Sequence, residues 1–171
     1  MNLIYKLFLT FNATLWVVVI YGIKEDWTIA PLPTWLFAIL LLLVPILLSA
    51  VSIPMTLKLS KDNLKTCGEL EEANSSFLPV YLGYFFVGLE IDKLPHMIII
   101  YLVIFVFTYV AQVQYFNPMY LLFGYRYYNA ETEQGTKVFL IARKNLRKAK
   151  DAEFNHLRRI NDTTYIAWRE K

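Results

Sequence analysis

The sequence predicts a membrane protein in which a bundle of four transmembrane helices is followed by a small β-rich cytoplasmic domain. The first observation is composition: 57% of the 171 residues are hydrophobic and 18% are charged, against about 45–50% and 25% in average soluble domains. The second is that four apolar segments precede position 117, whereas short aromatic and apolar runs follow it. The third is charge: residues 124–171 carry eleven lysines and arginines against six acids, and residues 1–123 carry six against eight.

The predicted transmembrane domain covers residues 1–116, with helices at about 7–23, 35–55, 77–91 and 96–114. No small-x-small cleavage site follows the first segment, so we do not interpret it as a signal peptide. The second and fourth segments are long enough to span a bilayer. The apolar core of the third has only 13 residues and rises about 20 Å, short of a hydrocarbon core of roughly 30 Å. It either spans, with local thinning or snorkelling of Glu90 and Lys93, or re-enters.

Loop charges favour spanning and set the orientation. With both termini inside, fifteen lysines and arginines lie on the inner side, and only Lys24 and Lys93 lie outside. The positive-inside rule therefore predicts a multi-pass protein with both termini cytoplasmic. Glu90, at the end of the third segment, is the one charged residue within the predicted helices, and the lack of charge at membrane depth argues against a proton-coupled transporter. Asn12 and Gln112 are expected to hydrogen-bond across helices, and a pore lined by them in an oligomer is the alternative.

Residues 117–171 form the predicted cytoplasmic domain, because Pro118 cannot continue the fourth helix. Aromatic and β-branched runs predict four antiparallel strands, at about 124–129, 137–143, 157–160 and 163–168. Domains of this size rarely bury enough apolar surface to be stable alone. We therefore expect the missing burial to come from the membrane segments, from other copies of the chain or from a partner protein.

Catalytic and metal-binding patterns are absent from the sequence. Its two histidines, His96 and His156, and its single cysteine, Cys67, do not have the spacing of a metal site. There is no glycine-rich phosphate loop and no nucleophile or zinc-protease motif. We expect no enzymatic activity, no cofactor and no small-molecule substrate. Three glutamates of the inner loop are interpreted as a solvated face: Glu69, Glu71 and Glu72.

The basic residues of the tail are the strongest candidate for a binding site. Five of them fall within eight residues, 143–150. Such a cluster could bind anionic lipid, nucleic acid phosphates or an acidic protein surface, and a simple positive-inside flank explains it equally well. The candidate partner- or lipid-binding residues are Arg143, Lys144, Arg147, Lys148, Lys150, Arg158 and Arg159.

Three stretches of the tail resemble a known family. Residues 117–128 read NPMYLLFGYRYY, residues 135–143 read GTKVFLIAR and residues 157–162 read LRRIND. Together with four preceding apolar segments, they are similar to the KwaA family, the membrane subunit of the bacterial Kiwa anti-phage system. The resemblance implies a four-helix inner-membrane protein that forms homo-oligomers and senses phage infection. It also implies a soluble DNA-binding partner, KwaB, that blocks phage DNA replication and late transcription, and it carries over no catalytic residue.

These observations predict a non-enzymatic sensor and scaffold in the bacterial inner membrane. Its basic tail would recruit a KwaB-like cytoplasmic effector, and whether the tail itself contacts nucleic acid is left open. The alternative is a pore-forming or membrane-depolarising protein, based on the polar residues within the helices.

Overall fold

The computed structural model describes residues 3–64, 67–111, 117–132, 135–146 and 154–167. The chain divides into two compact units, and both are discontinuous in sequence. The helix unit consists of Leu3–Ser52 and Phe77–Met119, and the β unit consists mainly of Ile53–Ser76 and Tyr120–Lys171. The sequence-based boundary lies between residues 116 and 117 and leaves the loop before Phe77 with the helices, whereas the structural division falls between Met119 and Tyr120. In the structure this loop belongs with the tail.

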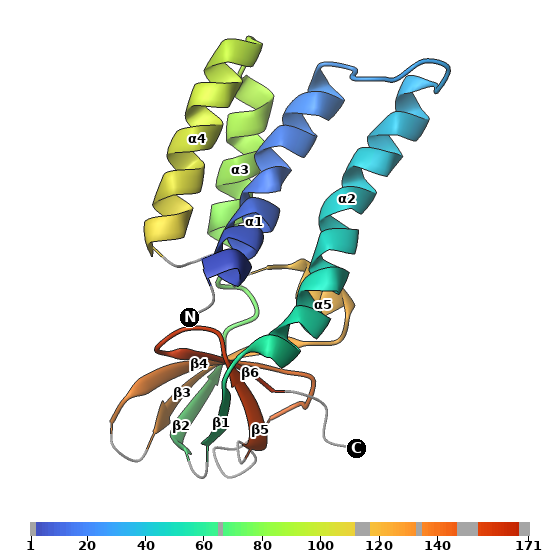
Figure 1. Ribbon diagram of the computed structural model, residues 1–171. Coiled ribbons are helices and arrows are strands. Elements are labelled where there is room, and N and C mark those ends of the chain that lie inside the picture. The colour runs from blue at the N-terminus through green and yellow to red at the C-terminus, as the bar shows by residue number, and fades with distance from the viewer. Residues whose placement is uncertain (1–2, 65–66, 112–116, 133–134, 147–153, 168–171) are drawn as a thin grey trace. The chain divides into compact units, whose positions relative to one another are not determined.

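Four helices make up most of the helix unit (Figure 1). They are α1 (Leu3–Lys24), α2 (Thr34–Met55), α3 (Leu78–Glu90) and α4 (Leu94–Ala111). Among the described residues, α1, α2 with its continuation to Lys58, and α4 are long and apolar enough to cross a membrane. The predicted count of four such helices is therefore too high by this criterion. The third segment gives only a 13-residue helix, because Ile91 adopts an extended conformation and ends it.

Helix α1 is the centre of the helix unit, because it packs against both α3 and α4. Its Trp16 ring lies edge-on to the rings of Tyr81 and Phe85, at centroid distances of 6.5 and 6.0 Å. At the far end of α1, the Lys24 ammonium donates to the Asp92 carboxylate at 2.7 Å and to the Ile91 carbonyl at 2.9 Å. The end of α1 is therefore fixed to the turn between α3 and α4.

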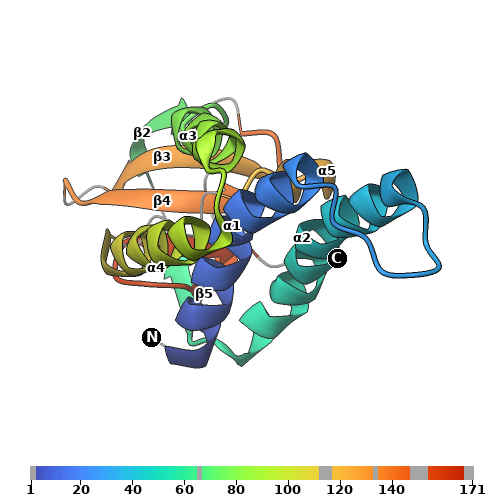
Figure 2. The same cartoon turned by 90° about the horizontal axis from the view of Figure 1, so that it is seen from above.

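Helix α2 is attached differently. Of its described side chains only Pro45, Ser49 and Ser52 are buried, and Figure 2 shows α2 on the opposite side of α1 from α4. The Asn12 amide donates to the Ser49 hydroxyl at 2.8 Å, which confirms the predicted hydrogen bond across helices. Gln112, the other residue predicted to make such a bond, lies outside the described residues.

The β unit contains one six-stranded sheet with the strand order β1-β5-β6-β4-β3-β2. Its strands are β1 (Lys61–Leu64), β2 (Cys67–Glu72), β3 (Arg126–Thr132), β4 (Lys137–Ala142), β5 (Phe154–Arg159) and β6 (Thr164–Ala167). The tail supplies four strands, as predicted. The expectation of a purely antiparallel, four-stranded sheet is wrong, because β4 and β6 pair in parallel and the loop adds β1 and β2. The parallel pair arises because β5, which follows β4 in the chain, lies on the outer side of β6.

The sheet must curve strongly, because only residues 65–66 separate β1 from β2 although these strands lie at opposite ends of the strand order. The three Cα–Cα steps from Leu64 to Cys67 reach at most about 11 Å. A flat sheet of six strands would separate its edges by about 24 Å. The sheet is therefore strongly curved, and the end of β1 lies close to the start of β2.

The inner face of this curved sheet holds the core of the β unit. Tyr128, Leu140 and Leu157 are each about 1% exposed and belong to one apolar cluster. Leu64 from β1 and Leu70 from β2 pack against the same cluster. Part of the apolar burial that the tail cannot provide alone thus comes from the loop between α2 and α3. The sequence did not predict this source.

A short helix, α5 (Met119–Leu122), leads from the helix unit into β3. The Asn117 side-chain oxygen accepts a hydrogen bond from the Met119 amide at 3.0 Å. After α5 the chain turns at Gly124, which has a φ of 77°, a conformation that glycine adopts without strain.

Candidate functional site

The structure describes four of the seven basic residues that the sequence predicts as a binding site. Arg147, Lys148 and Lys150 lie outside the described residues. Arg158 and Arg159 are neighbours in β5, so their side chains point to opposite faces of the sheet. Adjacent positions in the sequence therefore do not make one surface.

Arg143 and Lys144 follow the end of β4, and both are exposed. The Arg143 guanidinium lies 4.8 Å from the centroid of the buried Tyr125 ring. A cation over an aromatic face is a favourable arrangement, so the planar group of Arg143 is held in place although it remains accessible. The Lys144 backbone oxygen accepts a hydrogen bond from the Tyr128 hydroxyl at 3.1 Å.

Arg158 instead meets a lysine of the loop. It is the Cα partner of Lys61 in the pairing of β1 with β5, so the two side chains share the outer face of the sheet. The Arg158 guanidinium donates to the Leu59 carbonyl at 3.0 Å. Lys58 lies three positions after Met55, the last residue of α2, and its side chain is exposed. These residues form a basic edge that we define as Lys58, Lys61 and Arg158.

Sequence reasoning missed Lys58 and Lys61, because the loop was treated as separate from the tail. The sequence signal that the loop and the tail could meet was the predicted topology, because it places both segments on the same side of the membrane. Positive charges close to the end of a membrane helix attract anionic headgroups. The same charges can also attract an acidic protein surface.

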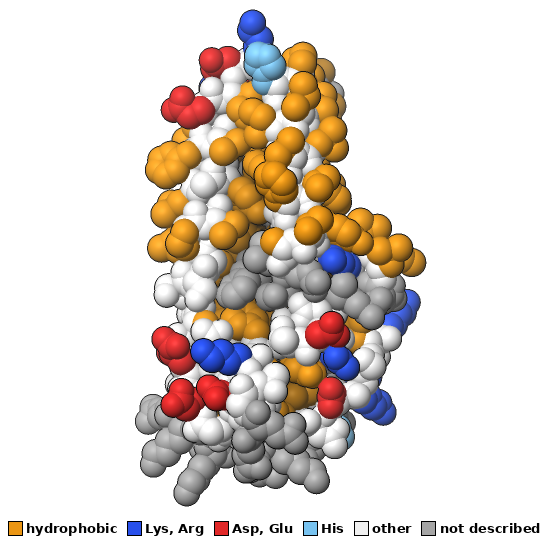
Figure 3. Space-filling model, turned by 90° about the vertical axis from the view of Figure 1, so that its left-hand side faces the viewer, with side chains coloured by type: hydrophobic (Ala, Val, Ile, Leu, Met, Phe, Trp, Pro, Cys, Tyr) orange, Lys and Arg blue, Asp and Glu red, His pale blue; other side chains and the backbone are white. Residues whose placement is uncertain are grey.

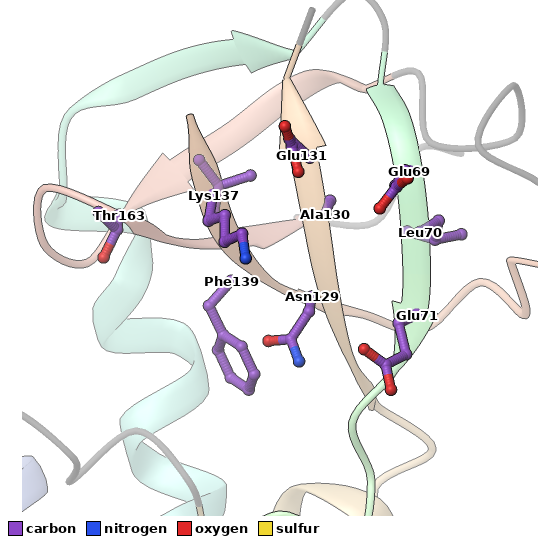
Figure 4. Close-up of a pocket in the computed structure, with 10 residues that line it drawn as sticks. Glu69, Leu70, Glu71, Asn129, Ala130, Glu131, Lys137, Phe139 and Thr163 are labelled. Atoms are coloured by element: carbon purple, nitrogen blue, oxygen red, sulfur yellow. The ribbon is translucent and has the colours of Figure 1, made fainter. Parts of the chain in front are cut away.

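A second charged feature lies on the outer face of β2, β3 and β4. There a cavity of about 340 Å³ is lined by acidic, basic and aromatic side chains. Glu69 pairs with Glu131, and Glu131 pairs with Lys137 in the strand registers. Figure 4 shows these three side chains extending from three neighbouring strands. We call this the acidic pocket, and its charged members are Glu69, Glu71, Glu131 and Lys137.

The three loop glutamates, which the sequence predicts to form one solvated face, lie in two different environments. Glu69 and Glu71 alternate along β2 and line the acidic pocket, whereas Glu72 is paired with Arg126 at 3.1 Å. None of the four charged groups of the pocket takes part in an ion pair within the described chain. Over the same described ranges, no three His, Cys, Asp or Glu side chains are grouped to hold a metal ion. The chemistry of the pocket therefore suits an organic cation, such as a lysine or arginine side chain.

The histidines and the cysteine lie in different parts of the fold. His96 is exposed in the first turn of α4, and His156 is exposed in β5. Cys67 begins β2 as a free, half-buried thiol, and burial raises the pKa of this thiol above its usual value. A raised pKa lowers the thiolate fraction at neutral pH, so Cys67 lacks the chemistry of an activated nucleophile.

The helices present a different surface. Figure 3 shows apolar side chains over the visible face of the helices, with charged side chains and a histidine at their tip. The exposed apolar residues include Leu47 on α2, Phe86 on α3 and Phe107 on α4. Contiguous apolar surface of this extent is what a bilayer or another membrane helix covers.

The chain was compared with known proteins. A family model described as "Anti-phage protein KwaA" matches residues 5–166, which include both units. No curated protein and no solved structure matches the chain. The family match therefore rests on the sequence of nearly the whole chain.

Proposed function

The chain belongs to the KwaA family of anti-phage proteins, and from this we propose that it is a non-enzymatic sensor and scaffold of the bacterial inner membrane. In this proposal its β unit recruits a KwaB-like, DNA-binding effector in the cytoplasm. The observation that carries the proposal is the composite sheet, in which strands from an inter-helix loop and from the tail fold together. The sheet carries two charged features, the basic edge and the acidic pocket. In the described strand registers, no residue of one is paired with a residue of the other.

The composite sheet also supports four membrane crossings. Strands β2 and β3 pair directly, from Cys67↔Thr132 to Glu72↔Tyr128, so they lie on the same side of the membrane. The chain between them must then cross an even number of times. Helix α4 is long enough to cross. Of the two other described helices between β2 and β3, α5 has only four residues, which leaves α3 for the second crossing. We therefore propose that the short α3 crosses with local thinning of the bilayer.

The position of α1 supports an inner N-terminus. The C-terminal residue of α1, Lys24, is bonded to Asp92 in the turn between α3 and α4. This turn is at the opposite end of the α3–α4 hairpin from the segments that enter the sheet. Helix α1 therefore begins on the same side as the sheet, as the inside-positive charge distribution requires.

Cysteine labelling tests the proposed topology. In a Cys67→Ser background, Lys93→Cys and Glu71→Cys place single exposed thiols at the turn between α3 and α4 and on β2. A membrane-impermeant maleimide should label the first variant in intact spheroplasts and the second only after permeabilisation. Labelling of both variants in intact spheroplasts would contradict the proposal that α3 and α4 form a crossing hairpin.

Recruitment needs point substitutions rather than truncation, because deletion of residues 124–171 would leave β1 and β2 without pairing strands. We propose that the effector contacts the tail residues Arg143 and Arg158 together with the acidic pocket. The tagged chain, expressed with its operon neighbours, should retain a soluble DNA-binding protein through detergent purification. Glu69→Lys/Glu131→Lys and Arg143→Glu/Arg158→Glu should each reduce retention in a salt-dependent way.

Lys93→Glu is the matched control, since it reverses a charge that the proposed topology places outside. Undiminished retention by both double variants would refute recruitment through these surfaces. Purification of the chain alone, as a defined oligomer with no soluble protein, would favour the pore instead. The buried Thr14, Thr108 and Asn12 side chains bond within the helix unit, which supports the scaffold over a pore lined by them.

A further inference from the structure

A buried polar network fixes α2 to the rest of the helix unit. The Ser49 hydroxyl accepts a hydrogen bond from the Asn12 amide and one from the Asn117 amide, both at 2.8 Å. It also donates to the Pro45 carbonyl at 2.6 Å. One hydroxyl offers one donor and two acceptor positions, so Ser49 is saturated. The bonds from Asn12 and Asn117 thus converge on one atom, the Ser49 Oγ.

Asn12 is left incompletely satisfied by this arrangement. The residue is 1% exposed, and its side-chain oxygen has no hydrogen-bond partner. Buried carbonyl oxygens without a donor are uncommon in folded proteins, because the oxygen loses its water and gains nothing in return. A movement of α2 that admitted water beside Asn12 would supply the missing donor. The packed arrangement therefore carries a cost that an opened arrangement does not.

Pro45 is the one apolar residue among the described side chains of α2 that is fully buried. Of the 22 side chains of α2, ten are exposed, nine are partly buried and three are buried, and apolar surface gains no hydrophobic driving force from meeting another helix within lipid. Pro45 also lacks the amide hydrogen that would continue the helical ladder one turn before Ser49. The hydrogen bonds to Ser49 thus hold α2 next to a position where its own backbone is weakened.

The network lies at the points where the chain leaves the helix unit. Ser49 is four residues before Ile53, and Asn117 is three residues before Tyr120, the positions at which the chain enters the β unit. The Asn117 oxygen also accepts from the first amide of α5. Release of Ser49 would therefore free two of the connections that lead to the strands.

We propose that Asn12, Ser49 and Asn117 form a latch that holds α2 in a closed position and whose opening frees the segments that lead to β1 and β3. This proposal rests on the sensor function proposed above and names the moving element. Interhelical hydrogen bonds in membranes each change an equilibrium by about threefold on average. Loss of both bonds to Ser49 should therefore raise the ratio of open to closed molecules about tenfold.

Distance measurements between spin labels test the latch. In a Cys67→Ser background, Val51→Cys on α2 and Val110→Cys on α4 place labels on exposed positions of the helix unit. The labelled chain alone is reconstituted in nanodiscs, so the result does not depend on any effector. Ser49→Ala should add or enlarge a population with a longer distance. Asn12→Leu should do so less strongly, because it removes one bond together with the unsatisfied oxygen.

Thr108→Val is the matched control. It removes the 3.1 Å bond between Tyr84 and Thr108, which joins α3 to α4, and it leaves Ser49 and its partners intact. The control should keep the wild-type distance distribution. An unchanged distribution in Ser49→Ala, or an equal change in Thr108→Val, would overturn the proposal. If the latch opens as expected but no effector is retained in the recruitment experiment, only the proposed recruitment fails.

Discussion

Gly88 on α3 lies so close to α1 that a single added methyl group should weaken the helix unit. A Cβ atom at this position would be 3.0 Å from the Ile20 Cβ and 3.1 Å from the Val17 carbonyl oxygen. Neither neighbour is the flexible end of a side chain, so the helices must move apart by a few tenths of an ångström. Overpacking of this kind typically costs about 1–3 kcal/mol. Alanine also gains up to about 1 kcal/mol over glycine in helix propensity.

Gly83 provides the matched comparison in the same helix. A Cβ added there meets nothing within 4 Å, so Gly83→Ala should gain the propensity term without the steric cost. Gly88→Ala should therefore be less stable than Gly83→Ala by about 1–3 kcal/mol. Thermal unfolding in detergent, followed by near-UV circular dichroism, measures the difference. Equal stability of the two variants would refute the close packing of α1 against α3.

Three further predictions concern single side chains. The hydrogen bond from Lys24 lowers the pKa of Asp92 below 3.8. This pair should therefore stabilise the fold fully above pH 3.8 and lose its effect only as the pH falls through the lowered pKa. Asp92→Asn should remove that acid step from pH-dependent melting curves. Asn74→Ala removes the 2.8 Å acceptor of the Tyr127 amide and should cost about 1 kcal/mol in chemical unfolding. The raised pKa of Cys67 predicts slower alkylation by iodoacetamide at pH 7.5 in the folded chain than in the unfolded chain, with rates that converge at high pH.

The helices and the tail strands could be predicted because their signals are local. Apolar runs gave α1, α2 and α4 to within a few residues, and alternating aromatic and β-branched residues gave β3 to β6. The polar sequences of β1 and β2, KDNL and CGELEE, show no run of core residues. They are the two ends of the strand order, and their pairing strands come from a distant part of the chain. Pairing of this kind leaves no periodic signal in the strand itself.

The candidate surfaces were harder to predict for the same reason. Arg158 and Arg159 are adjacent in the sequence, but strand geometry separates them and places Arg158 opposite Lys61. Glu69 and Glu131 are far apart in the sequence, but the pairing of β2 with β3 makes them neighbours. A charge run indicates which segment is basic, whereas only the strand register decides which charges share a face.

The pairing of β2 with β3 joins the segments of chain that precede α3 and follow α5. Strand β2 leads through Ala73 and Asn74 into α3, and the chain after α4 leads through α5 into β3. The Ala73 amide donates to the Tyr127 carbonyl at 2.8 Å, and the Tyr127 amide donates to the Asn74 side chain at 2.8 Å. These two bonds extend the β2–β3 pairing to the point where the chain leaves for α3. The strands that continue from α3 and α5 along the chain are therefore the ones that carry Glu69, Glu71 and Glu131 of the acidic pocket, so substitutions in this pairing should be judged by their effect on the pocket.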